Sequence, residues 1–218
     1  MASWTNRTVT NNHLIPYVDS KKAPPEVAAA LNTLPFERNI FKLLANADSL
    51  FTPFMPLLAS CWGPGRAARP SEWQLTVLRT SALLDAPYEW DVNEPVARVL
   101  GFGDERLALI RKGDLSSTAL FTDRHRLIGE MVRELVEGNQ VMEATMRRAQ
   151  EMLGPKVTME VMMIHSIYGM LARIMRSAKI DFDPEIPGLL DMLRGYNARA
   201  IEEEKKYAEE DGIGFFPA

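Results

Sequence analysis

The chain has 218 residues, of which 46% are hydrophobic and 25% are charged, and this is the composition of an ordinary globular protein with one large domain or two small ones. Its 25 basic and 29 acidic side chains are mixed along the sequence and leave a net charge of −4, so we predict no basic face and no nucleic-acid partner. The first residues contain no apolar signal segment, and no apolar run is long enough to span a membrane, so we expect a cytoplasmic protein with no membrane partner.

Cysteine and histidine usage excludes several kinds of chemistry. Cys61 is the single cysteine, which rules out an internal disulfide and a two-cysteine redox cycle within one chain. His13, His125 and His165 are far apart and lack the spacing of metal ligands, so we predict no metal site. His125 stands among charged residues and is expected on a solvated turn of helix. The sequence has no glycine-rich fingerprint for a phosphate or a dinucleotide, and we expect no cofactor.

The first part of the chain predicts an extended arm followed by helices. Residues 1–23 are polar and irregular, and we expect them to lie as an arm along the body. A proline pair precedes a short helix predicted over 27–31. Apolar residues at helical spacing predict further helices over 39–46 and 50–61, and two prolines within the second should bend it or restart it.

The next segment predicts two helices separated by a tight connection. Residues 62–70 form a loop rich in glycine and proline, and a serine is a suitable N-cap for a helix over 71–84. Pro87 begins the following helix, which extends to residue 100. Because this helix contains Pro95, a kink or break is predicted near Asn93.

The rest of the chain continues as helices. They are predicted over residues 104–111, 122–137, 140–153, 157–177 and 186–210. Segment 157–177 is the most apolar and carries methionines on nearly all sides, so we predict that it is the central helix; its methionines could also line a pocket for an apolar ligand. No segment alternates with period two, and the sequence therefore predicts an all-α protein, with a domain over 24–190 and a C-terminal helix and tail over 191–218.

A polar and aromatic segment, residues 85–94, marks the expected site. Glu89 and Asn93 are four residues apart and share one face of a helix, and Gln74 would come from the neighbouring helix. One titrating carboxyl group among amide donors suits proton abstraction from an acidic carbon. Glu89 is therefore the predicted base, and Asn93 and Gln74 would orient the substrate. The alternative is that Glu89 forms a structural ion pair with an arginine such as Arg79.

A histidine on the most apolar helix is the second candidate. His165 precedes Tyr168 by three residues, so both lie on one side of the helix and could supply an acid, although such a histidine can also be a satisfied core residue. The remaining candidates for substrate binding are aromatic, and packing or a subunit contact is their alternative role: Tyr88, Trp90 and Tyr168.

Several of these segments resemble the carboxymuconolactone decarboxylase-like, or alkylhydroperoxidase D-like, family. They are Gln-Leu-Thr-Val-Leu-Arg at 74–79, Ala-Pro-Tyr-Glu-Trp at 86–90, Pro-Val-Ala at 95–97 with Gly101, and Tyr-Gly-Met-Leu-Ala at 168–172. The resemblance extends over most of the chain. It implies a single-domain helical bundle of the alkylhydroperoxidase D-like type that forms oligomers.

The positions that carry chemistry in that family differ here. Its redox members place a Cys-x-x-Cys pair, a histidine four residues on and a glutamate of the preceding helix where this chain has Ala86, Glu89, Asn93 and Gln74. Peroxidase and disulfide reductase chemistry is excluded because both need the missing sulfur. The decarboxylase-type members share Tyr-Glu-Trp and keep the histidine as a proton donor, a role that the amide of Asn93 cannot perform.

We therefore expect a cofactor-free acid/base enzyme that acts on a small oxygenated metabolite, for instance in secondary metabolism. Isomerisation, cyclisation, dehydration and decarboxylation are all compatible with the sequence. The alternative is a non-catalytic family member that binds a small molecule or serves as an assembly subunit. Several helices carry apolar residues on more than one side, so a homo-oligomer is expected in either case.

Overall fold

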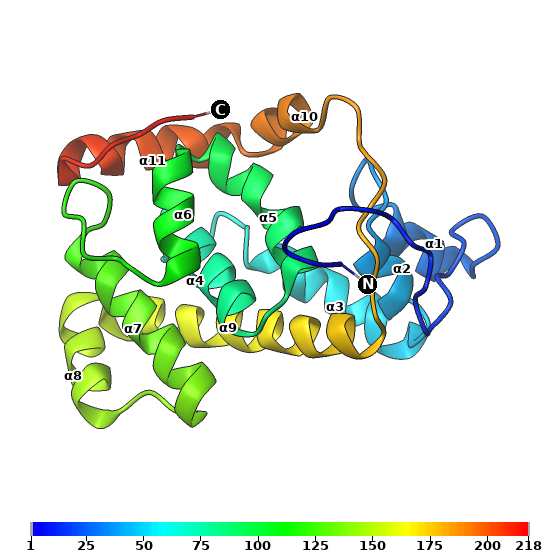
Figure 1. Cartoon of the computed structure of the whole chain (residues 1–218), viewed down its shortest axis with the longest axis horizontal. Coiled ribbons are helices and arrows are strands. Elements are labelled where there is room, and N and C mark those ends of the chain that lie inside the picture. Colours follow the sequence, from blue (N-terminus) through cyan, green and yellow to red (C-terminus); the bar gives the residue numbers. More distant parts are fainter. Residues whose placement is uncertain (1, 218) are drawn as a thin grey trace. The chain divides into compact units, whose positions relative to one another are not determined.

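The computed structural model describes residues 2–217, which form eleven α-helices and no β-strand (Figure 1). The prediction of an all-α protein is confirmed. No helix among these residues is long and apolar enough to cross a membrane. The chain divides into two compact units, Met1–Gly65 with Arg173–Pro187, and Arg66–Ala172 with Gly188–Ala218. The boundaries expected from the sequence, after residues 23 and 190, stay a prediction.

The first unit contains three short helices and the end of a long one. The helices are α1 (Pro25–Leu31), α2 (Asn39–Leu44), α3 (Asp48–Ser60) and the last turn of α9 (Gly154–Ser177). α3 does not restart at either of its prolines. Pro53 and Pro56 both lie on the exposed side of the helix, where water can bind the carbonyl groups that lose their N–H partners.

A buried acid holds the first unit together. Asp183 Oδ2 lies 3.0 Å from Arg38 Nη1, and both residues are at most 5% exposed. Asp183 Oδ1 also accepts a hydrogen bond of 2.7 Å from the backbone N–H of Asn39, the first residue of α2. The N-terminal segment is fastened to the same stretch, because the backbone N–H groups of Thr10 and Asn11 both donate to Asp181 Oδ2.

The Asp183 contact predicts a large loss of stability when it is removed. Asp183→Ala leaves the guanidinium of Arg38 buried without a counter-charge, and we expect the free energy of unfolding to fall by about 3–5 kcal/mol. Glu37→Ala removes the partially exposed pair between Glu37 and Lys42 and should cost less than about 1 kcal/mol. Urea denaturation of both variants measures the difference. Equal losses would contradict the role given to Asp183.

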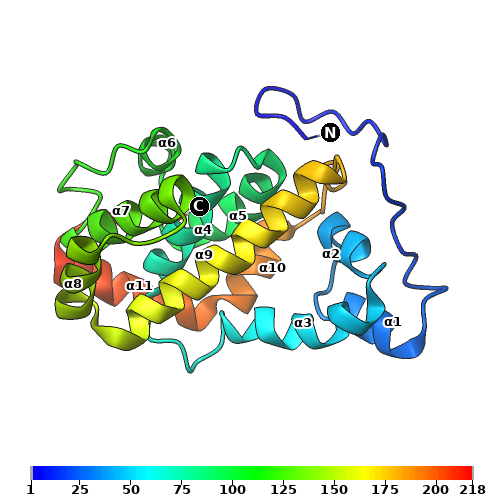
Figure 2. The same cartoon turned by 90° about the horizontal axis from the view of Figure 1, so that it is seen from below.

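The second unit is built around α4. Its helices are α4 (Pro70–Leu83), α5 (Pro87–Val99), α6 (Asp104–Lys112), α7 (Asp123–Gly138), α8 (Glu143–Met152), most of α9, α10 (Leu189–Tyr196) and α11 (Ala198–Asp211). α4 contacts α5, α6, α7 and α11, while α7 and α8 lie side by side (Figure 2). Every residue from Pro70 to Ser81 is buried.

The prediction that segment 157–177 is the central helix is wrong for this unit. α9 is amphipathic, and Met159, Met163 and Met170 are exposed. α4 is buried instead, although polar side chains make up a larger share of its residues. Hydrophobicity misleads here because a polar side chain can be buried once it is hydrogen-bonded, whereas methionine is tolerated at the surface.

α5 lacks the kink or break that was predicted near Asn93. α5 continues through Pro95 to Val99 without the predicted break, since Pro95 removes only the hydrogen bond to the carbonyl of Asp91, a partially exposed residue.

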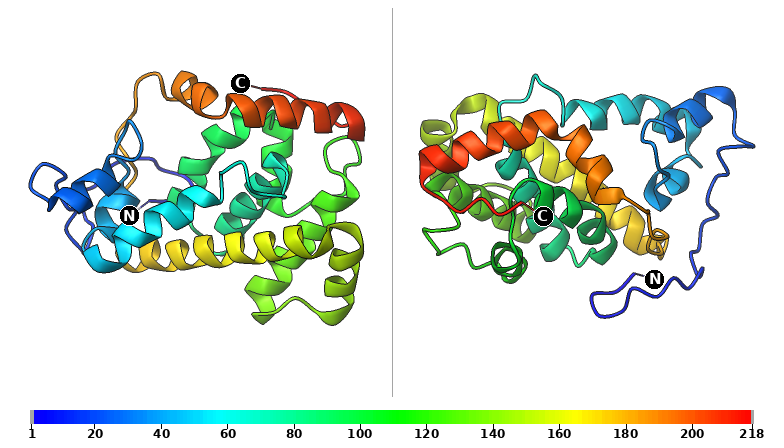
Figure 3. Two further views of the ribbon diagram at one scale, coloured as in Figure 1. Left: turned by 180° about the vertical axis from the view of Figure 1, so that it is seen from behind. Right: turned by 90° about the horizontal axis from the view of Figure 1, so that it is seen from above.

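After α11 the chain turns back along that helix (Figure 3). Gly101 follows α5 with a φ of 88°, and a Cβ atom there would lie 2.4 Å from the ring of Phe215, so only glycine fits this position.

Candidate active site

Three of the predicted site residues meet at the interface of α4 and α5. Gln74 Nε2 donates a hydrogen bond of 2.6 Å to the backbone carbonyl of Asn93, and Ser81 Oγ lies 3.2 Å from Glu89 Oε2. Asn93 Nδ2 in turn donates to the carbonyl of Glu89 at 2.8 Å. The earlier residue of α4, Gln74, contacts the later residue of α5, Asn93, while Ser81 contacts Glu89. The two helices are therefore antiparallel, and their polar residues form one buried row.

Arg79 does not pair with Glu89. It lies on the opposite side of α4 from Ser81, and its Nη1 donates a hydrogen bond of 2.6 Å to the carbonyl of Ile110 near the end of α6. Among residues 2–217 the carboxyl group of Glu89 has a hydrogen bond only with Ser81, and its Oε1 has no partner. The alternative of a structural ion pair between these two residues is therefore wrong.

Burial decides the protonation state of Glu89. The residue is 2% exposed, and this burial raises the pKa of its carboxyl group well above the ordinary 4.5, an effect that the Ser81 hydroxyl only partly opposes. Glu89 stands in the first turn of α5, where the helix dipole favours a negative charge by about 0.3–1 kcal/mol. Leaving a charge buried without a partner costs several kcal/mol, so burial outweighs the dipole.

The hydrogen bonds of Ser81 lead to the same conclusion. Ser81 Oγ lies 2.8 Å from the carbonyl of Val77, which can only accept a proton. A hydroxyl has a single proton, and the nearer carbonyl of Val77 competes for it with Glu89 Oε2 at 3.2 Å, so Ser81 stabilises a negative charge on Glu89 only weakly. The raised pKa therefore favours the protonated form of Glu89, which can donate a proton.

A second buried hydroxyl group of α4 forms a hydrogen bond to α9. Thr80 Oγ1 lies 2.9 Å from His165 Nδ1 and donates its own proton to the carbonyl of Thr76 at 2.8 Å. Thr80 Oγ1 must then accept from Nδ1–H, and the neutral imidazole carries its lone pair on Nε2. His165 is 7% exposed.

The aromatic candidates are all buried. The ring of Tyr168 packs edge-on against Trp73 with 5.7 Å between the ring centroids. Trp90 Nε1 donates a hydrogen bond of 2.6 Å to Glu94 Oε2, one turn further along α5. Tyr88 is 2% exposed. These contacts favour packing over substrate binding for Trp90 and Tyr168.

Thr80 and Ser81 are site residues that the sequence did not predict. They stand within an otherwise apolar stretch of α4 and read as interruptions of its apolar face. One signal was available, since Thr76 and Thr80 are four residues apart, which is the spacing of hydroxyl groups that share a helix face. Their partners on α5 and α9 are distant in the sequence, so only the fold reveals them.

A second buried polar cluster lies at the start of α4 and corrects the expectation for His125. This residue is 2% exposed and accepts the backbone N–H of Thr122 on Nδ1, so its Nε2–H donates to Ser71 Oγ at 2.9 Å. Ser71 is thus not activated as a nucleophile. Its backbone N–H donates to Glu204 of α11 at 3.0 Å, and burial raises the pKa of that glutamate to about 7. The cluster fastens α11 to α4.

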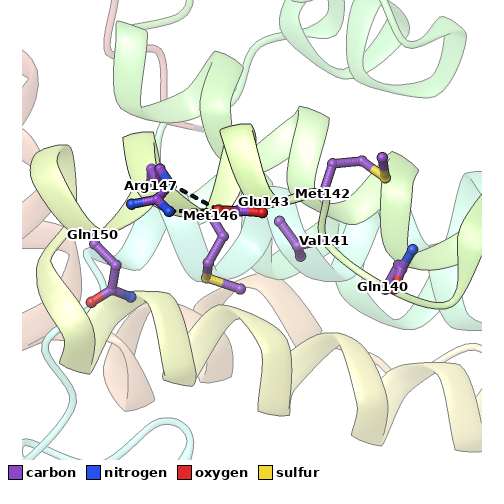
Figure 4. Close-up of a pocket in the computed structure, with 7 residues that line it drawn as sticks. All are labelled: Gln140, Val141, Met142, Glu143, Met146, Arg147 and Gln150. Atoms are coloured by element: carbon purple, nitrogen blue, oxygen red, sulfur yellow. Dashed lines mark hydrogen bonds and ion pairs between the residues drawn. The ribbon is translucent and has the colours of Figure 1, made fainter.

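An open pocket of about 560 Å³ lies on the connection between α7 and α8 and along α8 (Figure 4). Its polar side chains include Glu143 and Arg147, which form an ion pair on the surface of α8. None of the predicted site residues lines it. No group of three or more His, Cys, Asp and Glu side chains within residues 2–217 has an arrangement that could hold a metal ion.

No protein-family model matches the chain, and no curated protein sequence matches it.

The protonated state of Glu89 predicts a pH-dependent stability. Since the folded-state pKa is raised above 4.5, the wild-type protein loses stability as pH rises from about 4.5 towards the folded-state pKa. Glu89→Gln keeps the neutral form, so its advantage over wild type should grow by up to about 1.4 kcal/mol per pH unit in that window.

Urea denaturation at several pH values measures this difference. The matched control is Glu105→Gln, which removes an exposed glutamate of α6 and reports the effect of a charge lost at the surface. A constant difference between Glu89→Gln and wild type would show that Glu89 is ionised in the folded protein.

Proposed function

We propose that this protein is a cofactor-free enzyme that performs acid/base chemistry on a small oxygenated organic molecule, with Glu89 as the general acid. The observation that carries the proposal is a fully buried carboxyl group with one unpartnered oxygen and no ion pair. Such a group costs stability, and carboxyl groups with strongly raised pKa values cluster at active sites. The sequence suggested a base at this position, and the burial that raises the pKa of the Glu89 carboxyl group favours an acid instead.

The proposed reaction class combines Glu89 as the acid with His165 as the base. His165 Nε2 would take a proton from a carbon next to a carbonyl group, and the electron pair of that C–H bond would become the C=C bond of an enol. The carbonyl oxygen would receive the proton of Glu89. Return of the proton at another carbon gives an isomerisation, and loss of a β-hydroxyl as water, with the proton held by His165, gives a dehydration. In a β-keto acid the C–C bond to the carboxylate would break in place of the C–H bond, so that CO2 leaves and its electron pair forms the enol while Glu89 protonates the carbonyl oxygen.

The amides of the row suit substrate orientation. Gln74 is fully buried and its Oε1 has no partner, so it offers an acceptor to a substrate hydroxyl. Asn93 cannot move a proton in the useful pH range, which is why the acid is assigned to Glu89.

We also propose that the chain is a member of the carboxymuconolactone decarboxylase-like family with its alkylhydroperoxidase D-like fold. The contact between Gln74 and Asn93 supports this, because these positions correspond to the glutamate and the histidine that cooperate in the redox members of that family. In this chain the amide side chains of Gln74 and Asn93 occupy these two positions, and amides cannot relay a proton. The family chemistry based on a histidine at position 93 is therefore not proposed.

Hydrogen–deuterium exchange at carbon tests the proposed reaction. β-Keto acids, 2-oxo acids and unsaturated lactones are incubated with the protein in D2O, and NMR follows deuterium incorporation next to the carbonyl group. We expect the protein to accelerate exchange for at least one compound class, and Glu89→Gln to slow it by about 100-fold or more. Glu105→Gln should retain the wild-type rate. A Glu89→Gln variant with the wild-type rate would remove Glu89 from the mechanism.

The second candidate function is assembly, and the exposed side of α9 favours it. Met159, Met163 and Met170 are 53%, 51% and 39% exposed and are spaced four and seven residues apart, so they form one stripe. Exposed methionine stripes are typical of protein contact surfaces. A self-associating member without catalytic activity would use this stripe.

Self-association is tested by changing the middle of the stripe. If α9 forms a contact between copies, Met163→Lys should weaken association by about tenfold or more in sedimentation equilibrium, because a lysine charge would have to be desolvated. Tyr196→Lys changes another exposed apolar residue, 62% exposed on α10, and is the control that should leave association unchanged. A wild-type protein that is monomeric at high concentration would contradict the assembly role.

A further inference from the structure

One turn of α4 carries two adjacent hydroxyl groups that serve different helices. Thr80 and Ser81 are both fully buried, and each donates to the carbonyl four residues earlier at 2.8 Å. Thr80 Oγ1 is then left as an acceptor towards its second neighbour, whereas Ser81 Oγ shares its proton between that carbonyl and Glu89 Oε2. Thr80 faces His165 on α9, and Ser81 faces Glu89 on α5.

We propose that Thr80 is a positioning residue for the acid/base pair, which holds His165 in the tautomer with the proton on Nδ1 and the lone pair on Nε2. This inference rests on the proposed function and adds to it the control of the base. Ser81 contacts the acid in parallel, since its Oγ lies 3.2 Å from Glu89 Oε2. One turn of helix thus contacts both groups.

The tautomer decides which ring nitrogen can act as a base. A neutral imidazole has one basic nitrogen, and the hydrogen bond made by the other nitrogen selects it. Without an acceptor at Nδ1, the ring could carry its proton on Nε2, and that nitrogen could then not take a proton from carbon. Thr80 cannot reverse its role easily, because its own proton is committed to the carbonyl of Thr76.

The helix supplies a matched control for this hydroxyl. Thr76 is also fully buried and donates to the carbonyl four residues earlier, that of Glu72, at 2.8 Å. Among residues 2–217 its hydroxyl has no contact with a histidine. Thr76→Val and Thr80→Val therefore delete equivalent groups, and only the second removes an acceptor from His165.

NMR of protein labelled with ¹⁵N-histidine tests the proposal without a substrate. The ring nitrogens of His165, assigned with His165→Gln, should show the Nδ1–H tautomer in wild type, in Thr76→Val and in Thr80→Ser, which keeps the hydroxyl. Thr80→Val should lose this tautomer. The role of Thr80 is overturned if wild type shows Nε2–H, or if Thr80→Val leaves the tautomer unchanged.

Activity gives a second readout on any compound that undergoes exchange. We expect Thr80→Val to lower kcat by about tenfold or more with little change in KM, since it disturbs the base and not substrate binding, and Thr80→Ser to restore the rate. A wild-type protein that exchanges none of the compounds overturns the proposed function. An unchanged tautomer in Thr80→Val overturns only the inference about Thr80, so the two failures can be told apart.

Discussion

The fold of the larger unit depends on burying α4, a helix whose polar side chains all need partners. Glutamine, threonine and serine side chains interrupt its apolar positions, and an unpaired polar group in the interior costs about 1–3 kcal/mol. α4 meets this demand partly with its own carbonyl groups, as at Thr76, Thr80 and Ser81. The side chains of α4 also form hydrogen bonds with the neighbouring helices. Their partners are Asn93 and Glu89 on α5 and His165 on α9. The arrangement of helices is therefore tied to hydrogen bonds as well as to apolar packing.

Two buried acids show the two ways in which a protein can tolerate such a group. Asp183 is paired with Arg38 and accepts a backbone N–H, so its negative charge is compensated on both oxygens. Glu89 has no ion pair, and burial raises the pKa of its carboxyl group, which favours the uncharged form. The first arrangement stabilises structure. The second leaves a proton donor inside the protein, and this difference is the reason for assigning chemistry to Glu89.

Two buried histidines show a similar contrast. His125 accepts a backbone N–H on Nδ1 and closes the start of α7, so its Nε2 carries the proton and its neighbour Ser71 is not activated. His165 donates from Nδ1 to Thr80 and keeps its lone pair on Nε2. The two residues have the same side chain and comparable burial, yet their contacts at Nδ1 favour opposite tautomers. The difference lies at Nδ1, which faces a hydroxyl acceptor in His165 and a backbone N–H donor in His125.

The sequence by itself determined the all-α class, the extent of most helices and the shared face of Glu89 and Asn93, because these depend on residue spacing and on proline and glycine positions within one segment. It could not identify α4 as the central helix, since the burial of its hydroxyl and amide side chains depends on partners far away in the chain. Nor could it decide that Arg79 turns to the end of α6 and leaves Glu89 without a counter-charge. The protonation of Glu89 and the tautomer of His165 are set by distances between helices, and only the tertiary structure brings those groups together.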